Sequence, residues 1–405
     1  MGEFPLPGVY YNEEVTYELT GEGSKIPVFI GKTGNTSAQN DKYKVDGSVA
    51  LKFTNINDVL RPVVKTGDDW ESKTGIGGVD GNGELVASNK LANVINDFYD
   101  EAKLKQNNDI GVPYLYVIDV GAGTALADWN RAFDTAKKLI DATVQAYVGA
   151  DSIVSGNTAY ELTEFITAAA EVLDTEARDL NLKYGFVFKE NATDDALKTV
   201  VSTIVNSCDD ESIKKFSRIG LIEEDKFGKH VARICCTPNN TEPGYYEFRS
   251  IEPEEFKLRT KEQMQGLQNG GVIFGRDEYV NGVRYPKINL CVSVAFAYES
   301  RPADSLFHAR FNADDLLREV FEACYPQVKA NESVSNISYL QTRINKIVND
   351  RVNAEEMIKY NERTEEGTRL IVSKSDENPY TLRVSGQIQP VKCTIAIDVD
   401  ATIIL

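Results

Sequence analysis

Residues 394–405 read Thr394-Ile395-Ala396-Ile397-Asp398-Val399-Asp400-Ala401-Thr402-Ile403-Ile404-Leu405, and this stretch says most about how the chain is built. Its residues alternate between two faces, which is the pattern of a half-buried β-strand. The apolar face carries Ile395, Ile397, Val399, Ala401 and Ile403, and the other face carries Thr394, Ala396, Asp398, Asp400 and Thr402. We expect the two aspartates to face solvent or to meet Lys or Arg across a strand pair. Such a strand needs a sheet to join, and that sheet belongs either to the same subunit or to a neighbouring one.

The beginning of the chain is also predicted to be extended. It contains Pro5-Leu6-Pro7-Gly8-Val9-Tyr10-Tyr11, in which Pro7-Gly8 predicts a turn. Two short strands are expected around the turn at Gly21-Glu22-Gly23, and the second of them is Ile26-Pro27-Val28-Phe29-Ile30-Gly31. The sequence therefore predicts strands rather than helices at both ends of the chain.

The composition is typical of a globular protein with two or three domains. The chain has 405 residues, of which 42% are hydrophobic and 26% charged, and its net charge is −18. No apolar run approaches the roughly 20 residues of a membrane helix, and we expect neither membrane embedding nor a signal peptide. Lys and Arg do not cluster, so we expect no nucleic-acid partner. The six cysteines form no Cys-x-x-Cys pair and are expected to be buried free thiols.

The middle of the chain predicts an α/β arrangement. Residues 32–111 are rich in glycine and turns, with a helix from Ser88 or Asn89. From about residue 112 to 236, strands alternate with helices, which is the signature of a layered α/β fold. The elements expected there include strands at Tyr114–Val120, Tyr184–Phe188, Arg218–Ile222 and His230–Cys236, and one long helix whose apolar stripe runs from Trp129 to Tyr147. Towards the end of the chain we expect a long helix at 335–361 and strands at Thr368–Ser373, Tyr380–Gln389 and Val391–Ile404.

No catalytic constellation emerges from the sequence. The run Val117–Ala125 places Gly121 and Gly123 after a strand, as in dinucleotide sites, but Leu126 stands where the third glycine would be. A tight turn between strand and helix is the simpler interpretation. The two histidines, His230 and His308, have no metal-ligand spacing and no flanking nucleophile motif. We therefore expect no enzyme activity, no cofactor and no metal.

The two ends together resemble the contractile tail sheath family of phages and related injection systems. Members of that family open with a Pro-Gly-Val-Tyr element followed by a Val-x-Phe-x-Gly-like strand, here Pro7–Tyr10 and Val28–Gly31. They close with a long helix, a strand pair around an Asp-Asn-Pro-like turn, an Ile-x-Pro-Val step and an alternating strand. The corresponding segments here are 335–361, Ser375–Pro379, Ile388–Val391 and 394–405. The resemblance covers about the first 31 and the last 70 residues.

The resemblance implies a multi-domain, tail-sheath-like α/β protein of mixed α+β character. Residues 1–31 and 272–405 would form a discontinuous inner domain with strand-exchanging termini. Residues 112–271 would form an outer α/β domain, and residues 32–111 an inserted segment rich in loops and β structure. The inter-subunit strands would use Val9, Tyr10, Tyr11, Ile395, Ile397, Val399, Ala401 and Ile403, and hinges would lie at Gly31, Gly34 and Gly367.

The function implied by the resemblance is structural. Subunits would polymerise as stacked hexameric rings around an inner tail tube protein, and contraction would drive the tube through a target envelope. The partners would be copies of the chain, the tube, and baseplate and terminator proteins. The protein would reside in the cytoplasm of the producing cell during assembly, and then in a virion tail or injection particle. Two alternatives remain open: a nucleotide-binding α/β enzyme using Gly121–Gly123, and a self-assembling shell protein that does not contract.

Overall fold

The structure is a computed structural model, and it divides into two compact units. It describes residues 25–33, 50–60, 65–66, 69–70, 75–78, 84–104, 110–121, 123–155, 158–178, 181–280, 282–300, 305–327, 334–374 and 382–391. Among these, residues 25–239 and 243–307 form what we call the sheet unit. Residues 240–242 and 308–391 form what we call the hairpin unit.

The sheet unit is built on a seven-stranded sheet whose order is β11-β10-β9-β6-β1-β5-β2. All neighbouring strands are parallel except β2, which runs antiparallel to β5 at one edge. The strands are β1 (Ile26–Gly31), β2 (Ala50–Phe53), β5 (Leu115–Asp119), β6 (Ala142–Val148), β9 (Tyr184–Val187), β10 (Ile219–Ile222) and β11 (Val272–Ile273). The first strand in the sequence thus lies inside the sheet, with the chain winding outwards from it in both directions, as in doubly wound folds.

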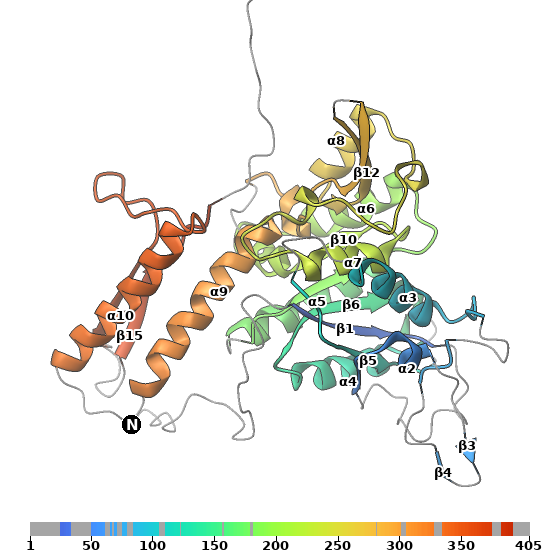
Figure 1. Cartoon of the computed structure of the whole chain (residues 1–405), viewed down its shortest axis with the longest axis horizontal. Coiled ribbons are helices and arrows are strands. Elements are labelled where there is room, and N and C mark those ends of the chain that lie inside the picture. The colour runs from blue at the N-terminus through green and yellow to red at the C-terminus, as the bar shows by residue number, and fades with distance from the viewer. Residues whose placement is uncertain are drawn as a thin grey trace, which may run out of the picture. The chain divides into compact units, whose positions relative to one another are not determined.

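Helices cover both faces of this sheet (Figure 1). The helix α3 packs against α7 on one face, while α4, α5 and α6 follow one another on the other face. The bounds of these helices, and of α8, are as follows: α3 (Lys90–Ala102), α4 (Leu126–Lys137), α5 (Leu162–Arg178), α6 (Asp194–Val205), α7 (Phe227–Cys236) and α8 (Lys261–Asn269). Because both faces are covered, the central strands are buried throughout, as parallel sheets require.

Alternate residues of β1 supply the two halves of the core. Val28 and Ile30 are fully buried in the cluster that includes Trp129 and Phe165, whose ring centroids lie 5.0 Å apart. Phe29 points to the opposite face, where its ring meets Phe98 of α3 edge-on at 5.2 Å. A strand with apolar residues at every position therefore serves two layers at once.

The helix starts follow ordinary capping chemistry. The side chain of Asn89 accepts a hydrogen bond from the backbone of Ala92 at 3.0 Å at the start of α3. Thr193 caps α6 in the same way, and Thr260 with Gln263 forms a capping box at α8. These side chains satisfy backbone N–H groups that have no partner within the helix. The start of α3 confirms the predicted helix from Ser88 or Asn89.

Smaller elements decorate the sheet unit. The short helix α2 (Ile56–Leu60) contacts α3. Three two-stranded ribbons are formed by β3 (Lys65–Thr66) with β4 (Asp69–Trp70), β7 (Val154–Ser155) with β8 (Thr158–Ala159), and β12 (Gly275–Val280) with β13 (Val283–Ile288). None of the helices among the described residues is long and apolar enough to cross a membrane.

The hairpin unit consists of two helices and one antiparallel strand pair (Figure 1). Its elements are α9 (Phe307–Cys324, entering the unit at His308), α10 (Val334–Asn353), β14 (Arg369–Lys374) and β15 (Leu382–Gln387). Its core is the buried cluster Leu316, Val320, Leu340, Ile344, Val348, Met357, Leu370 and Val372. The unit is thus a thin layer of sheet on a layer of helix.

The domain boundaries expected from the sequence differ from those in the structure. The expectation groups residues 26–31 with residues 272–405, whereas β1 lies between β5 and β6 in the sheet unit. The expected insertion at 32–111 includes β2 and α3, which are also integral parts of that unit. The reason is that a parallel sheet collects strands from distant parts of the chain, so proximity in sequence does not define its members.

Three of the secondary-structure predictions were wrong, two of them for the same reason. The stripe from Trp129 to Tyr147 divides into α4 and the buried strand β6, and His230–Cys236 is part of helix α7. Strands and helices that are buried all round carry apolar residues at most positions, so periodicity does not distinguish them. The predicted helix at 335–361 ends at Asn353 because Glu355 adopts a left-handed conformation with φ of 59°.

Candidate assembly surface

All the residues predicted to join subunits lie outside the described part of the chain. These are Val9, Tyr10, Tyr11, Ile395, Ile397, Val399, Ala401 and Ile403, together with the predicted hinge Gly34. The structure does describe the part of the hairpin unit that precedes residues 394–405 in the sequence, up to Val391. The candidate surface in that part is the strand pair β14–β15.

One face of the β14–β15 pair is apolar and packs on the helices. In β14, Leu370 and Val372 are 6% and 7% exposed and belong to the core of the hairpin unit. Val384 lies directly opposite Val372 in β15 and packs against the same core. The apolar face of the pair therefore continues up to β15, which forms one edge of the two-stranded sheet.

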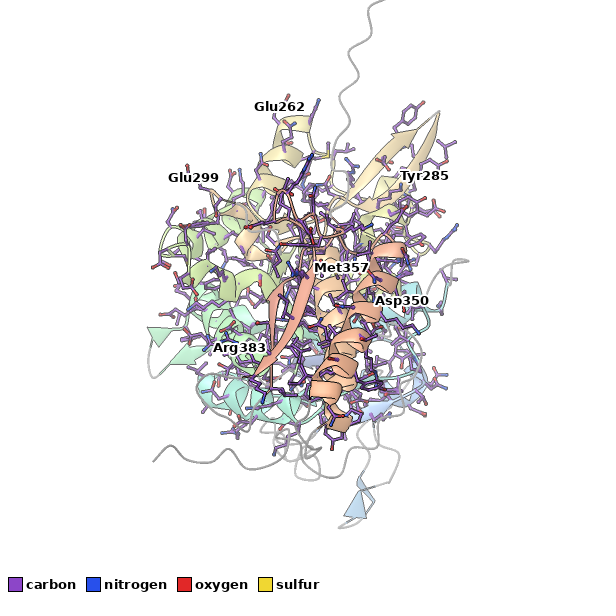
Figure 2. All side chains as sticks on the ribbon, turned by 90° about the vertical axis from the view of Figure 1, so that its left-hand side faces the viewer. Glu262, Tyr285, Glu299, Asp350, Met357 and Arg383 are labelled. Carbon is purple, nitrogen blue, oxygen red and sulfur yellow. The ribbon has the colours of Figure 1, made fainter. Side chains whose placement is uncertain are left out.

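The other face of the pair is exposed and mixed in character. Ile371 is 42% exposed and lies opposite Ser385. Arg383 is exposed on β15, opposite Ser373 (Figure 2). Two-stranded sheets with one uncovered face are marginally stable by themselves, so this face and its edges are suited to accept further structure.

The two edges of the pair are not equivalent. In an antiparallel pair, residues of non-hydrogen-bonded pairs direct their main-chain groups outwards. On β14 the outward groups include the N–H of Val372 and the C=O of Leu370, and both bind the side chain of Gln341. On β15 the outward groups belong to Leu382, Val384 and Gly386, and no hydrogen bond joins them to another described residue. The β15 edge is therefore open within the described structure.

The chain on either side of the pair is firmly anchored. The N–H of Val391 donates to the C=O of Glu356 at 2.9 Å, and the N–H of Ile358 donates to the C=O of Gln389 at 2.9 Å. Arg351 adds ion pairs to Glu319 and Glu356, each at 2.5 Å. The described chain is therefore fixed up to Val391, after which residues 392–405 follow in the sequence.

The two predicted hinges that the structure describes differ in their surroundings. Gly367 has φ of 101°, which only glycine adopts without strain, and its N–H donates to Gln389 at 2.7 Å. Gly31 is paired on both sides, with Asp119 and Val148. A Cβ atom on Gly31 would lie 2.7 Å from the Cβ of Val148. We attribute the need for glycine at position 31 to this close packing. For Gly367, the hinge stays a prediction.

The turn at Gly121–Gly123 lies at the carboxyl ends of the parallel strands, where doubly wound folds bind ligands. Both glycines have positive φ. However, the side chain of Lys32 covers Gly123: a Cβ there would lie 2.6 Å from its Cε atom. The ammonium group of Lys32 donates to Ser152 Oγ at 2.7 Å, and Asp119 accepts hydrogen bonds from Thr33 and Gly121. The turn is therefore held by hydrogen bonds and side chains of the chain itself, which favours its interpretation as a tight turn between strand and helix.

Burial at this turn changes the acidity of Asp119. The carboxyl group is largely desolvated, and this raises its pKa to about 6 despite the hydrogen bonds from Thr33 and Gly121. Burial also lowers the pKa of Lys32. These groups tie β1, β5 and the segment after β6 together, so we interpret the cluster as structural.

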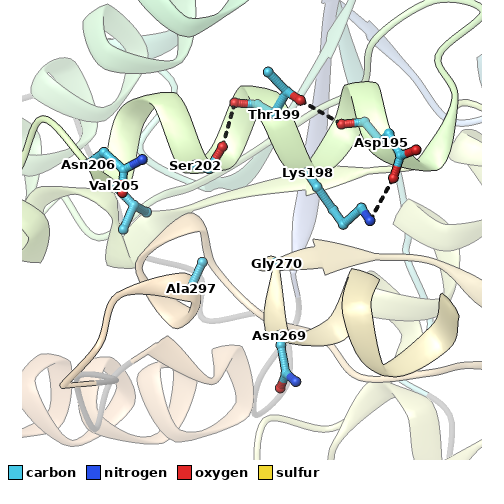
Figure 3. A pocket seen from close by; sticks show the side chains of 9 residues that line it. All are labelled: Asp195, Lys198, Thr199, Ser202, Val205, Asn206, Asn269, Gly270 and Ala297. Carbon is cyan, nitrogen blue, oxygen red and sulfur yellow. Dashed lines mark hydrogen bonds and ion pairs between the residues drawn. The ribbon is translucent and has the colours of Figure 1, made fainter. Parts of the chain in front are cut away.

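A hollow of about 440 Å³ opens beside α6 and α8 (Figure 3). Four of its polar side chains have partners within α6. Lys198 pairs with Asp195 at 2.7 Å, and Thr199 and Ser202 donate to carbonyl groups within α6. Because these groups are satisfied locally, the hollow has no set of side chains directed at a ligand.

Comparison with known proteins identifies the fold. No family model matches the sequence. The structure resembles the anti-feeding prophage helical sheath in its contracted state, with a TM-score of 0.61, 13% identity and coverage of 98% of this chain and 99% of that one. It resembles the sheath complex of the PVC extracellular contractile injection system, also contracted, with a TM-score of 0.60, 10% identity and coverage of 99% and 98%.

A third similar structure is the sheath tail protein of Desulfitobacterium hafniense. The TM-score is 0.53 at 10% identity, and the match covers 95% of this chain and 96% of that one. The chain therefore has the fold of contractile sheath proteins along nearly its whole length. This confirms the fold expected from the resemblance of the chain ends.

Sequence reasoning did not find two residues of the β14–β15 surface. Gln341 follows Leu340 in an amphipathic helix, where a polar residue normally faces solvent. Arg383 is one of many charged residues in the chain. Only the register of the strands and the position of α10 bring them to the edges of one small sheet.

Proposed function

We propose that this chain is a structural subunit of a contractile sheath. Copies of it polymerise as stacked six-fold rings around an inner tube and contract to drive the tube through a target envelope. The observation that carries this proposal is the likeness to two contracted sheaths along 98% or more of the chain.

The β15 edge provides a physical route for polymerisation. In our proposal, residues 394–405 of one copy add as a strand to the open edge of β15 in another. Main-chain hydrogen bonds supply the attraction, each contributing about 0.5–1.5 kcal/mol. Because donor and acceptor surfaces differ, the contact is head-to-tail and propagates instead of closing on itself. The segment Val9–Tyr11 joins subunits from the other end of the chain.

The side chains of the two strands are complementary. If the apolar face of residues 394–405 continues the face formed by Val372 and Val384, its isoleucines cover the helices of the acceptor. Asp398 and Asp400 then lie on the same side as Arg383, which is exposed on the neighbouring strand β15. Opposite charges on adjacent strands contribute about 0.2–1 kcal/mol, so they help to set the register.

The reach of the terminal segment is sufficient for a neighbour. Fourteen residues follow Val391 in the sequence, and an extended chain of that length spans at most about 50 Å. Gly367 lies beside this anchor and provides a hinge. Rotation there would let rigid units change their relative orientation during contraction while the strands stay paired.

The remaining roles follow from the same proposal. The hairpin unit corresponds to the inner part of the subunit, and the sheet unit to the outer part. The partners are further copies of the chain, the inner tail tube protein, and baseplate and terminator proteins. No nucleic acid takes part, and no membrane embedding is required. The protein assembles in the cytoplasm of the producing cell and then belongs to a virion tail or injection particle.

Electron microscopy of the purified protein tests this function. We expect hollow cylinders or stacked rings from the unaltered chain. Ile397→Pro should abolish them, because proline removes a ladder hydrogen bond, whereas Ile397→Val should leave them intact. Deleting residues 394–405 should give folded monomers. Monomers from the unaltered chain, or cylinders from the truncated one, would contradict the proposed coupling.

A charge-reversal series tests the register. Arg383→Asp should weaken polymerisation, and Asp398→Arg together with Asp400→Arg should restore it in the same chain. Cylinders that occur in only one length under all conditions would instead favour a shell that does not contract.

A further inference from the structure

Gln341 occupies an unusual position at the edge of the β14–β15 sheet. Its Oε1 atom accepts a hydrogen bond from the N–H of Val372 at 2.7 Å. Its Nε2 atom donates to the C=O of Leu370 at 2.9 Å and to Asn345 Oδ1 at 2.8 Å. Both hydrogens of the amide and one of its oxygen lone pairs are thus in use, which fixes the side chain in one orientation.

The two main-chain groups that bind Gln341 flank Ile371. A residue of an added parallel strand would bind the same two groups, because parallel ladders connect one residue to the two neighbours of its partner. The side-chain amide carries the same donor and acceptor as a peptide unit. Gln341 therefore stands in for one residue of a third strand and covers the middle of the β14 edge.

We propose that Gln341 closes the β14 edge to strand addition, so that incoming strands join the sheet only at β15. This inference rests on the proposed function, since it names the residue that decides where subunits connect. A strand that adds to β14 must first break the two hydrogen bonds between Gln341 and β14. The hydrogen bonds it then forms to the same two groups only replace those that were lost. A strand arriving at β15 gains its hydrogen bonds without displacing any described group.

The selection of one edge matters because a sheet with two open edges accepts two strands. Each subunit would then connect to more neighbours than a regular ladder requires, and branched aggregates would compete with the cylinder. Closing one edge with a side chain of the same unit keeps the number of connections fixed. The device needs no change of fold, because α10 already packs on β14 through Leu340 and Ile344.

The test uses the full chain with Ile397→Pro and Val399→Pro, which prevents it from donating its own terminal strand. A synthetic peptide of residues 394–405 serves as the probe. Hydrogen exchange with mass spectrometry reports protection of the segments 369–374 and 382–387, and native mass spectrometry reports the number of peptides bound. With Gln341 present, we expect one peptide and new protection at 382–387 only.

In Gln341→Ala, the 369–374 segment should exchange at least 10-fold faster before the peptide is added. A second peptide should then bind and protect it. Alanine favours helix at this position, so α10 should remain folded. Asn345→Ala is the matched control, because it removes a partner of Gln341 but none of the hydrogen bonds to β14. We expect this control to bind one peptide at 382–387.

The outcomes separate this inference from the proposed function. Peptide binding at 369–374 in the chain with Gln341 would overturn the inference while supporting strand addition. The inference would also be overturned, with strand addition still supported, if Gln341→Ala left the exchange rate of 369–374 and the number of bound peptides unchanged. Absence of peptide binding to any variant would count against strand addition by residues 394–405 and, with it, against a selecting role of Gln341. Because peptide binding at 369–374 in the chain with Gln341 would by itself overturn the inference, the inference can be tested even if the alanine variant fails to fold.

Discussion

The seven-stranded sheet and the β14–β15 pair differ in how much of their own surface the chain covers. In the sheet unit, β1 has hydrogen-bonded neighbours on both sides and helices on both faces. In the hairpin unit, β14 and β15 have helices on one face, and Ile371 and Arg383 lie exposed on the other. Under our proposal, the sheet unit is complete within one subunit, while the hairpin unit is completed by assembly.

Both units contain buried charged groups. In the sheet unit, Lys183 and Glu176 are both about 1% exposed and lie 3.4 Å apart. The ammonium group of Lys183 also donates to the carbonyl groups of Ala136 and Lys137 at the end of α4, and Glu176 accepts a hydrogen bond from Asn181. In the hairpin unit, Glu319 is 43% exposed in its ion pair with Arg351. Asp314 in the same unit is fully buried in its ion pair with Arg310, so ion pairs do not separate the two units.

The largest expected difference between the two units is in hydrogen exchange of the unassembled protein. Amides of β1 should exchange only through global unfolding, for which about 5–15 kcal/mol is typical of a domain. The outward amides of Val384 and Gly386 should exchange with almost no protection. Mass spectrometry of the segments 26–31 and 382–387 gives the comparison, and assembly should protect the second segment strongly. Equal protection in the free subunit would remove the distinction between the units.

Truncation of the core should have the next largest effect. Trp129 is fully buried, its ring packs on Phe165, and its N–H donates to the C=O of Gly123 at 3.0 Å. Trp129→Ala should therefore lower the free energy of unfolding of the sheet unit by about 3–5 kcal/mol in urea titrations. Tyr339→Ala on exposed α10 is the control and should stay within about 0.5 kcal/mol. A loss below about 1 kcal/mol at Trp129 would contradict the assigned core.

The packing of Gly31 predicts a smaller loss. A methyl group at this position meets the Cβ and carbonyl oxygen of Val148, both at 2.7 Å. Gly31→Ala should therefore destabilise the sheet unit by about 1–3 kcal/mol, measured by thermal and urea denaturation. Gly266→Ala in α8 is the matched control, since its Cβ meets only the end of Lys198 at 4.0 Å, and it should stabilise by up to about 1 kcal/mol. If Gly31→Ala left stability unchanged but impaired contraction, the hinge interpretation would return.

The smallest effect concerns pH. Burial raises the pKa of Asp119 to about 6, so the folded state binds this proton more tightly than the unfolded state. Its contribution to stability is fully present below the unfolded pKa of about 3.9 and is lost as the pH rises through about 6. Between pH 7 and pH 5 the sheet unit should gain about 1 kcal/mol from this group. Asp119→Asn should remove that part of the pH dependence, and an unchanged pH profile in the variant would refute the assignment.

The sequence predicted the parts of the fold that depend on local patterns. Caps such as Asn89 and Thr193 occur where a side-chain oxygen precedes an apolar periodic run. The strands β5, β9 and β10 were identified because short apolar runs lie between turn residues. The sequence failed where burial on all sides removes the periodicity, as in β6 and α7. It also failed at Asn353, because the left-handed residue that ends α10 is Glu355 and not a glycine.

The sequence predicted the strand that we propose to be donated to the candidate surface, but not the sheet that accepts it. The alternation in residues 394–405 indicates a strand that needs a sheet, but it does not indicate which sheet receives it. Gln341 and Arg383 carry no local signal, because a polar residue on a helix and a charged residue on a strand are common everywhere. Their importance depends on the neighbours that α10 and β14 give them.

By itself, the sequence predicted that the chain forms alternating strands and helices, which the structure shows, and that its ends are extended, which stays a prediction because they lie outside the described residues. These properties follow from residues close to one another in the chain, whose spacing alone fixes which side of an element is apolar. Only the tertiary structure decided that β1 lies inside the large sheet and that Gln341 binds the β14 edge of the small sheet, whereas the outward groups of β15 have no hydrogen-bond partner among the described residues. Main-chain groups are the same at every residue, so which of them find partners depends on packing between distant segments.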